Sequence, residues 1–156
     1  MISYGLEALD DQLLYAIQKR QTFKQTERAI RLTYESGITP MAHFMVGLPG
    51  QTEEMLWEEM KIIEEWILRY NLYAGDFYPM LVFPGTPLYQ ACPQFHNHNW
   101  LDDVSPKFVF KNVPVYFDKI PPERLLELSD ELNARCRELL AATSNIYNRQ
   151  VRRRRR

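Results

Sequence analysis

The chain has 156 residues, 46% of them hydrophobic and 13% aromatic, and a formal net charge of −1. This composition indicates a folded domain with its own core and excludes a disordered chain. No apolar run approaches the ~20 residues that a membrane-spanning helix needs, and residues 1–11 lack the basic and apolar regions of a signal peptide. We therefore expect a cytoplasmic protein with no membrane partner.

The charge is unevenly distributed along the chain. Residues 152–156 are all arginine, and without them 14 basic residues stand against 20 acidic ones, so the body carries a net charge of −6. A basic cluster can bind nucleic acid. Here no aromatic residues are interleaved for base stacking. Residues 151–156 are therefore interpreted as a frayed tail or an expression remnant, and nucleic-acid binding is the disfavoured alternative.

Hydrophobic periodicity predicts the order strand, helix, helix, strand, helix, strand and short helix over the first 91 residues. Thr22 and Thr52 are suited to cap the second and third helices, and Gly37 is suited to end the second. The second strand is apolar apart from His43, which is typical of a strand covered on both faces. The expected ranges are residues 2–6, 9–18, 22–35, 41–48, 52–70, 76–83 and 87–91.

The remainder of the chain is expected to be less regular until its last helix. Residues 93–107 are polar and indicate a loop, and residues 108–117 suggest an edge strand, because Pro114 cannot lie in a central one. A proline pair at 121–122 opens a long amphipathic helix that we expect to end near residue 148. The expected divisions are 1–92 for the α/β part, 93–120 for the connection, 121–150 for the helix and 151–156 for the tail.

Strands separated by helices of this length imply parallel β/α units. Three units are too few to close a barrel, so an open part of one is expected. In α/β barrels the chemistry collects at the carboxyl ends of the strands. Those ends carry Glu7, the turn at 47–50 and the turn at 83–87. The distinctive segments are therefore expected on one rim.

At that rim the sequence resembles the radical SAM superfamily, particularly its cobalamin-binding and coproporphyrinogen-dehydrogenase-like branches. The resemblance lies in residues 4–7 (YGLE), 44–54 (FMVGLPGQTEE) and 81–89 (LVFPGTPLY), in the order and spacing of the fourth, fifth and sixth barrel strands. Lys19 falls where the first of these units commonly has a basic residue. The resemblance covers about residues 2–92. It implies an α/β fold comprising the last three units of a partial (β/α)6 TIM-like barrel, followed by a C-terminal helical extension.

The resemblance also implies a site for S-adenosylmethionine (SAM). Glu7 would accept hydrogen bonds from the ribose hydroxyls, Lys19 would pair with the methionine carboxylate, and Met45 would pack near the adenine. Glu7 could instead cap the next helix, Lys19 could be a solvated residue, and His43 could be a core histidine or point at SAM. No catalytic residue or metal ligand is expected. The candidate cofactor-binding residues are Glu7, Lys19, His43, Met45, Gly47, Leu48, Pro49, Phe83, Pro84 and Gly85.

The cysteines depart from the family's pattern. Radical SAM enzymes hold a [4Fe–4S] cluster on a CxxxCxxC run, and cluster ligation needs several convergent thiolates. This chain has only Cys92 and Cys136, which are far apart. We therefore expect a fragment of a radical SAM enzyme, inactive alone, whose complete form cleaves SAM reductively and abstracts hydrogen from a small-molecule substrate. A separately encoded N-terminal half is an expected partner, and a non-catalytic binding module is the alternative.

A second cluster of polar side chains, Cys92, His96 and His98, could offer a metal site. Zinc sites need four protein ligands, or three and a water, and no fourth ligand is evident. A polar loop is the favoured interpretation of this segment.

Overall fold

The computed structural model describes residues 1–96 and 115–154. Strands and helices alternate along the chain, as the sequence predicts. The strands are β1 (Ile2–Glu7), β2 (Pro40–Val46) and β3 (Tyr73–Pro79), and the helices are α1 (Asp11–Ala16), α2 (Phe23–Glu35), α3 (Glu53–Tyr70), α4 (Pro87–Ala91), the 3₁₀ helix η1 (Pro93–Phe95) and α5 (Pro122–Arg154). Among the described helices, none is long and apolar enough to cross a membrane.

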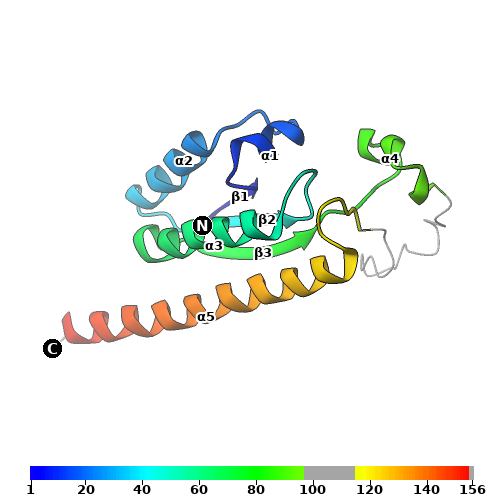
Figure 1. Cartoon of the computed structure of the whole chain (residues 1–156). Helices are drawn as coiled ribbons and strands as arrows, with labels where there is room; N and C mark the ends of the chain where they lie inside the picture. Colours follow the sequence, from blue (N-terminus) through cyan, green and yellow to red (C-terminus); the bar gives the residue numbers. More distant parts are fainter. Residues whose placement is uncertain (97–114, 155–156) are drawn as a thin grey trace, which may run out of the picture.

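The strands form one parallel sheet in the order β1-β2-β3. Each crossover is helical, with α1 and α2 between β1 and β2 and α3 between β2 and β3 (Figure 1). Parallel strands require such long connections. The expected α/β class with parallel β/α units is confirmed.

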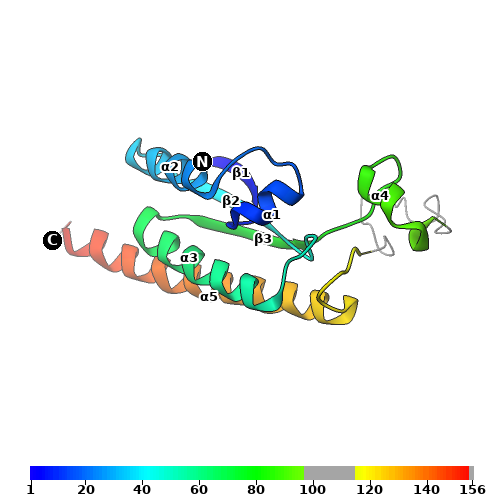
Figure 2. The same ribbon diagram turned by 45° about the horizontal axis from the view of Figure 1, so that its top comes forward.

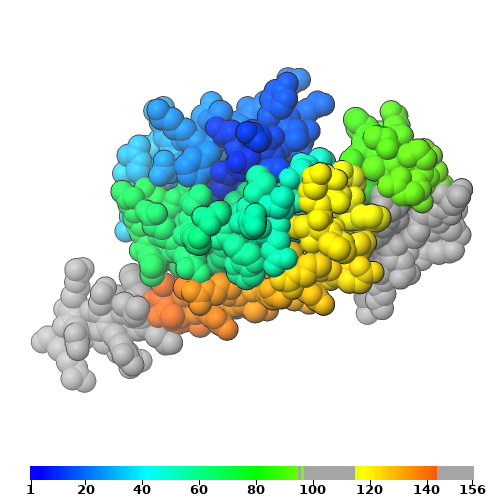
Figure 3. Space-filling model, in the orientation of Figure 1, coloured from blue at the N-terminus to red at the C-terminus, as the bar shows by residue number. Residues whose placement is uncertain are grey.

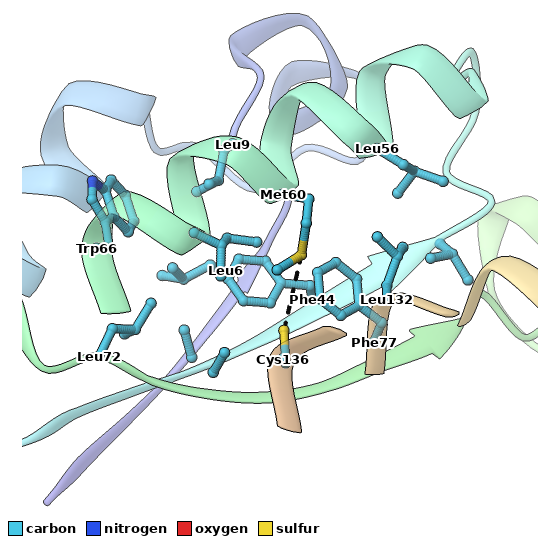
Figure 4. Close-up of a cluster of buried hydrophobic side chains, with 14 of the residues drawn as sticks. Leu6, Leu9, Phe44, Leu56, Met60, Trp66, Leu72, Phe77, Leu132 and Cys136 are labelled. Atoms are coloured by element: carbon cyan, nitrogen blue, oxygen red, sulfur yellow. Dashed lines mark hydrogen bonds between the residues drawn. The ribbon is translucent and has the colours of Figure 1, made fainter. Parts of the chain in front are cut away.

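The helices cover one face of the sheet and leave the other face more open. Along β2, Ala42, Phe44 and Val46 are buried in the core, while the alternate residues Met41, His43 and Met45 are only half-buried. Alternation of this kind follows from the two-residue repeat of a strand. Figure 4 shows Phe44 stacked against Phe77 of β3, with ring centroids 4.9 Å apart, between side chains of α3 and α5.

Helix α5 runs beside β3 and α3 along the length of the molecule (Figures 1 and 2). Its buried residues Leu125 and Leu128 are fully inaccessible. Arg124 pairs with Glu53 at the start of α3 and with Glu131 about two turns further along α5. In Figure 3 the residues just before and at the start of α5 pack against the beginning of α3, where Asp118 accepts a hydrogen bond from the Gly50 amide at 3.1 Å.

Several expected boundaries differ from those in the structure. β3 covers Tyr73–Pro79 rather than 76–83, since the chain leaves the sheet after Pro79, although Leu81 still forms an isolated antiparallel bridge to Val115. β2 ends at Val46 because Gly47 turns away with a φ of 84°. α1 is shorter than expected, and α5 continues to Arg154 instead of ending near residue 148. Most of the suggested strand at 108–117 lies outside the described residues.

Candidate functional site

Glu7 and Lys19 form an ion pair at the carboxyl end of β1. Lys19 Nζ lies 2.8 Å from Glu7 Oε1, and both side chains are partly buried, with 31% and 23% of their surfaces exposed. Glu7 is not the cap of α1, because Asp10 accepts the hydrogen bonds from Gln12 and Leu13 at that helix start. Lys19 lies after the end of α1 and is paired with Glu7, so it is not a solvated helix residue. The structure therefore brings the first two candidate residues into direct contact.

The backbone at Glu7 adopts an uncommon conformation. Its φ is 67°, and the Ala8 amide donates to the Leu6 carbonyl at 2.9 Å, which closes a γ-turn around Glu7. Turns of this kind with a positive φ are strained and rare. The pairing register with β2 also shifts between Gly5 and Glu7. A Cβ on Gly5 would lie 2.7 Å from Glu7 Oε1, so this glycine leaves room for the carboxylate.

The turn that carries Lys19 is also strained. α1 ends with the Lys19 amide bonded to the Leu14 carbonyl and the Gln18 amide bonded to the Tyr15 carbonyl, the pattern of a Schellman motif. Glycine is usual at the left-handed position of that motif, but here Gln18 occupies it with a φ of 56°. Arg20, on the other side of Lys19, has a φ of 54°. Left-handed residues thus flank Lys19 on both sides.

A small apolar cluster lies where the three strands end. It contains Ala8, Leu13, Leu14 and Leu48 as buried members. The partly buried side chains packed against it are Ile17, Met45, Met55 and Met80. Met45 and Leu48, two of the candidate residues, therefore lie next to the segment that follows Glu7. Flexible methionine side chains are well suited to line an apolar slot.

The turn after β2 is organised by a buried side chain to which the sequence analysis assigned no role. Gln51 is 1% exposed, and its Oε1 accepts hydrogen bonds from the Gly47 and Leu48 amides at 2.8 and 3.1 Å. The backbone amide of Gln51 donates to the Leu48 carbonyl at 2.9 Å, and Gly50 has a φ of 83°, so Pro49 and Gly50 form the centre of a type II turn. The signal for this role was the Pro-Gly pair followed directly by a residue with an amide side chain.

Gly47 itself is needed for packing within the chain. A Cβ at this position would lie 3.1 Å from the Leu125 side chain and 3.2 Å from the Tyr116 carbonyl oxygen. Together with the positive φ, these close contacts explain why a glycine stands here.

His43 lies on the more open face of the sheet, two residues before Met45 and on the same side of β2. Its Nδ1 is buried and has no hydrogen-bond partner among the described residues, so His43 is not a satisfied core histidine. A Cβ on Gly75 would lie 2.6 Å from that nitrogen, which shows that Gly75 makes room for the ring. The ring of Tyr78 lies 6.3 Å away, and the Tyr78 hydroxyl donates to Asp76 at 2.8 Å.

Phe83, Pro84 and Gly85 are exposed and are not part of the apolar cluster. They form a second turn of the same type, in which the Thr86 amide bonds to the Phe83 carbonyl and Gly85 has a φ of 86°. This turn leads to α4, which lies apart from the helices on the sheet in both ribbon views (Figures 1 and 2). The third candidate segment is therefore not brought to the Glu7–Lys19 pair.

No group of three metal-ligating side chains occurs among residues 1–96 and 115–154. Of the second polar cluster, His96 Nε2 lies 2.7 Å from the Tyr89 carbonyl oxygen, and His98 lies outside the described residues. Cys136 is in the core with its sulfur 4.0 Å from Met60 Sδ, and burial raises the pKa of its thiol to about 12. A thiol held in its protonated form is a poor metal ligand.

The sequence profile of the Radical SAM superfamily matches residues 1–63. This span contains β1, β2, most of α3 and the Glu7–Lys19 pair. The resemblance to this superfamily is thereby confirmed over a span that includes the motifs at residues 4–7 and 44–54.

Individual relatives match parts of the chain. The chain is 51% identical to an uncharacterized protein of Methanopyrus kandleri over 51 residues. These residues are 33% of this chain and 10% of that protein. The chain is 38% identical to the anaerobic magnesium-protoporphyrin IX monomethyl ester cyclase of Rubrivivax gelatinosus over 42% of this chain and 12% of the cyclase. It is 29% identical to the tRNA uridine(34) acetyltransferase of Methanocaldococcus jannaschii over 57% of this chain and 16% of that enzyme. The chain thus spans less than a fifth of the length of each of these relatives.

Proposed function

Residues 1–63 carry the sequence of the radical SAM superfamily, and from this premise we propose that the chain contributes part of the SAM pocket of a radical SAM enzyme. Its three parallel β/α units would be the last three of a partial (β/α)6 barrel. The observation that carries the proposal is the Glu7–Lys19 pair, a carboxylate and an ammonium 2.8 Å apart at the carboxyl end of a strand. That end of a barrel strand is where ligands bind.

The pair offers what the polar parts of SAM require. A carboxylate can accept hydrogen bonds from the two ribose hydroxyls, and an ammonium has three donors. Lys19 uses one donor on Glu7, which leaves others for the carboxylate of the methionine moiety. A partly exposed ion pair contributes at most ~1 kcal/mol to stability, whereas each left-handed non-glycine residue costs about 1 kcal/mol or more. Stability alone is therefore a weak reason for this arrangement, and ligand binding is a better one.

The apolar cluster would receive the adenine. Met45 and Leu48 lie beside Ala8, directly after Glu7 in the chain, so an apolar surface adjoins the polar pair. Adenosine sites combine such an apolar slot with a few polar groups. His43 lies on the same strand face as Met45, and its Nδ1 has no hydrogen-bond partner among the described residues. We propose that this nitrogen donates a hydrogen bond to the bound ligand or accepts one from it.

SAM bound at a reduced [4Fe–4S] cluster supplies radical hydrogen abstraction in this superfamily, and the residues of this chain do not fit such a cluster. Cys136 is enclosed in the core, and the other cysteine, Cys92, is buried. We propose that the cluster ligands lie outside these 156 residues, in the same longer protein or in a separately encoded N-terminal half. The substrate is proposed to be a small molecule.

A second candidate is a non-catalytic binding module. The sheet order favours it, since β1 is an end strand whose outer edge pairs with no other strand of the described sheet, and such an edge can bind a partner chain. A binding module would have no reason to place Glu7 and Lys19 for a small ligand. The two candidates therefore differ in whether SAM affinity depends on this pair.

The test is equilibrium SAM binding by the complete barrel, as one chain or as two co-expressed halves. Glu7→Ala removes a charge-assisted interaction worth ~1.5–3 kcal/mol, so the SAM dissociation constant should rise about tenfold or more. Asp10→Ala is the matched control, because it removes a nearby carboxylate that caps α1 and should lower stability by ~1 kcal/mol without changing SAM affinity. Equal affinities for wild type and Glu7→Ala would exclude Glu7 from the pocket.

A further inference from the structure

Glu59, in the middle of α3, is a carboxylic acid enclosed by the protein. Its surface is 3% exposed, and its Oε1 accepts a hydrogen bond from the Leu9 amide at 3.0 Å, across 50 positions of sequence. Its Oε2 has no partner among the described residues. The pKa of this carboxyl is raised to about 7, chiefly by burial; the bond from Leu9 lowers the pKa and the negative charge of Asp10 adds to the rise.

The amide that Glu59 binds belongs to the strained segment after β1. Glu7 has a φ of 67°, Ala8 closes the γ-turn, and Leu9 follows directly. The side chains of Ala8 and Leu9 are buried, and Leu9 points into the core beside Leu6 (Figure 4). A buried amide needs a hydrogen-bond partner, and a strained turn persists only where its surroundings hold it. Glu59 meets both requirements from a different element of the fold.

Glu59 also connects this turn to the rest of the site. Its helix begins directly after the Gly47–Gln51 turn, with Thr52 as its cap. Met55, one turn before Glu59, packs against the apolar cluster that contains Ala8 and Leu48. Any movement of the turn relative to α3 would therefore displace Glu7 from the apolar surface beside it.

We propose that Glu59 is a positioning residue for Glu7: through the Leu9 amide it holds the left-handed turn that directs the Glu7 carboxylate to Lys19. The inference rests on the proposed function, in which Glu7 and Lys19 bind SAM. Glu59 itself touches neither the ligand nor the pair and acts only through the backbone of residues 7–9.

The first test uses the 156-residue chain and needs no ligand. Glu59→Met keeps the length of the side chain but removes the acceptor, whereas Glu59→Gln keeps an oxygen for Leu9. Amide hydrogen exchange should rise ~tenfold or more at Leu9 in Glu59→Met and stay within about twofold of wild type in Glu59→Gln. Cys136→Ala is the control for general destabilisation, since it alters the core on the α5 side. Equal protection of Leu9 in Glu59→Met and in this control would overturn the proposal.

The second test measures SAM affinity in the complete barrel, at a temperature where all variants are folded. Glu59→Met should raise the SAM dissociation constant ~tenfold, Glu59→Gln should restore it, and Cys136→Ala should leave it unchanged. A rise that Glu59→Gln does not restore would overturn the positioning role. Exposure of the Leu9 amide with unchanged SAM affinity would also overturn the positioning role, whereas unchanged affinity in Glu7→Ala would refute the assignment of Glu7 to SAM, so the two proposals fail in different ways.

Discussion

Asn133 of α5 pairs with the backbone of Phe77 as a neighbouring strand would. Its Oδ1 accepts the Phe77 amide at 2.7 Å, its Nδ2 donates to the Phe77 carbonyl at 3.2 Å, and Ser129 donates to the same carbonyl at 2.7 Å. β3 is an end strand of the sheet, so α5 occupies backbone groups at that end. The outer edge of β1 pairs with no other strand of the described sheet, and this is the edge to which further strands can add.

The isolated chain should therefore self-associate through β1, because unpaired strand edges template the addition of other strands. The Ile2 amide bonds to Thr39 next to β2, so by alternation the Ser3 amide points to the outer edge. Ser3→Pro removes that donor without breaking the ladder to β2. Sedimentation velocity should show oligomers for wild type and a larger monomer fraction for Ser3→Pro.

A monomeric wild-type chain that melts cooperatively would contradict this prediction. It would mean that the sheet needs no further strand at β1, which would count against the proposed partial barrel.

Most of the fold could be predicted from local signals, and the misses have physical causes. Thr22 and Thr52 cap α2 and α3 as their residue type indicates. The expected strand starts at residue 76 rather than at Tyr73, because a glycine such as Gly75 is typical of a strand boundary. In the structure Gly75 lies within β3 and accommodates the His43 ring. Its end was missed because the apolar residues 80–83 resemble a strand, although Val82 is buried without being in one.

The candidate site was only partly predictable. The resemblance singled out Glu7 and Lys19, but their contact depends on a left-handed Gln18 where the pattern favours glycine. Gln51 and Glu59 lie inside polar runs that are typical of solvated surface, and only the tertiary packing of the turn after β2 and of α3 shows that they are buried. Burial of a polar side chain is a tertiary property, so periodicity does not reveal it.

The isolated chain should not assemble a [4Fe–4S] cluster, because cluster ligation needs several convergent thiolates and both of its cysteines are buried. Anaerobic reconstitution with iron and sulfide, followed by iron determination and EPR spectroscopy, is the measurement. We expect iron close to the background of a Cys92→Ser, Cys136→Ser double variant. Near four irons per chain together with a cluster EPR signal would contradict the prediction.

Glu59 should make stability fall as the pH rises. The unfolded chain releases this proton near pH 4.5, whereas the folded chain holds it until about pH 7. The contribution of Glu59 is therefore fully present below pH 4.5 and is lost progressively as the pH rises through about 7, by about 3 kcal/mol in all. Denaturant unfolding from pH 5 to 8 should show this slope in wild type relative to Glu59→Gln. Glu58→Gln, at an exposed position, is the matched control and should keep the slope.

The strain beside Lys19 should be measurable as stability. Gln18 occupies the left-handed position of a Schellman motif with a φ of 56°, a conformation that glycine adopts without steric cost. Gln18→Gly should therefore raise the free energy of unfolding by ~1 kcal/mol and the melting temperature by roughly 3 °C. Gln12→Gly is the matched control, because Gln12 lies within α1 and the same substitution there should destabilise by ~1 kcal/mol. Opposite signs for the two variants in thermal melting would establish the strain at Gln18, whereas destabilisation by both would show that Gln18 sits in its turn without strain.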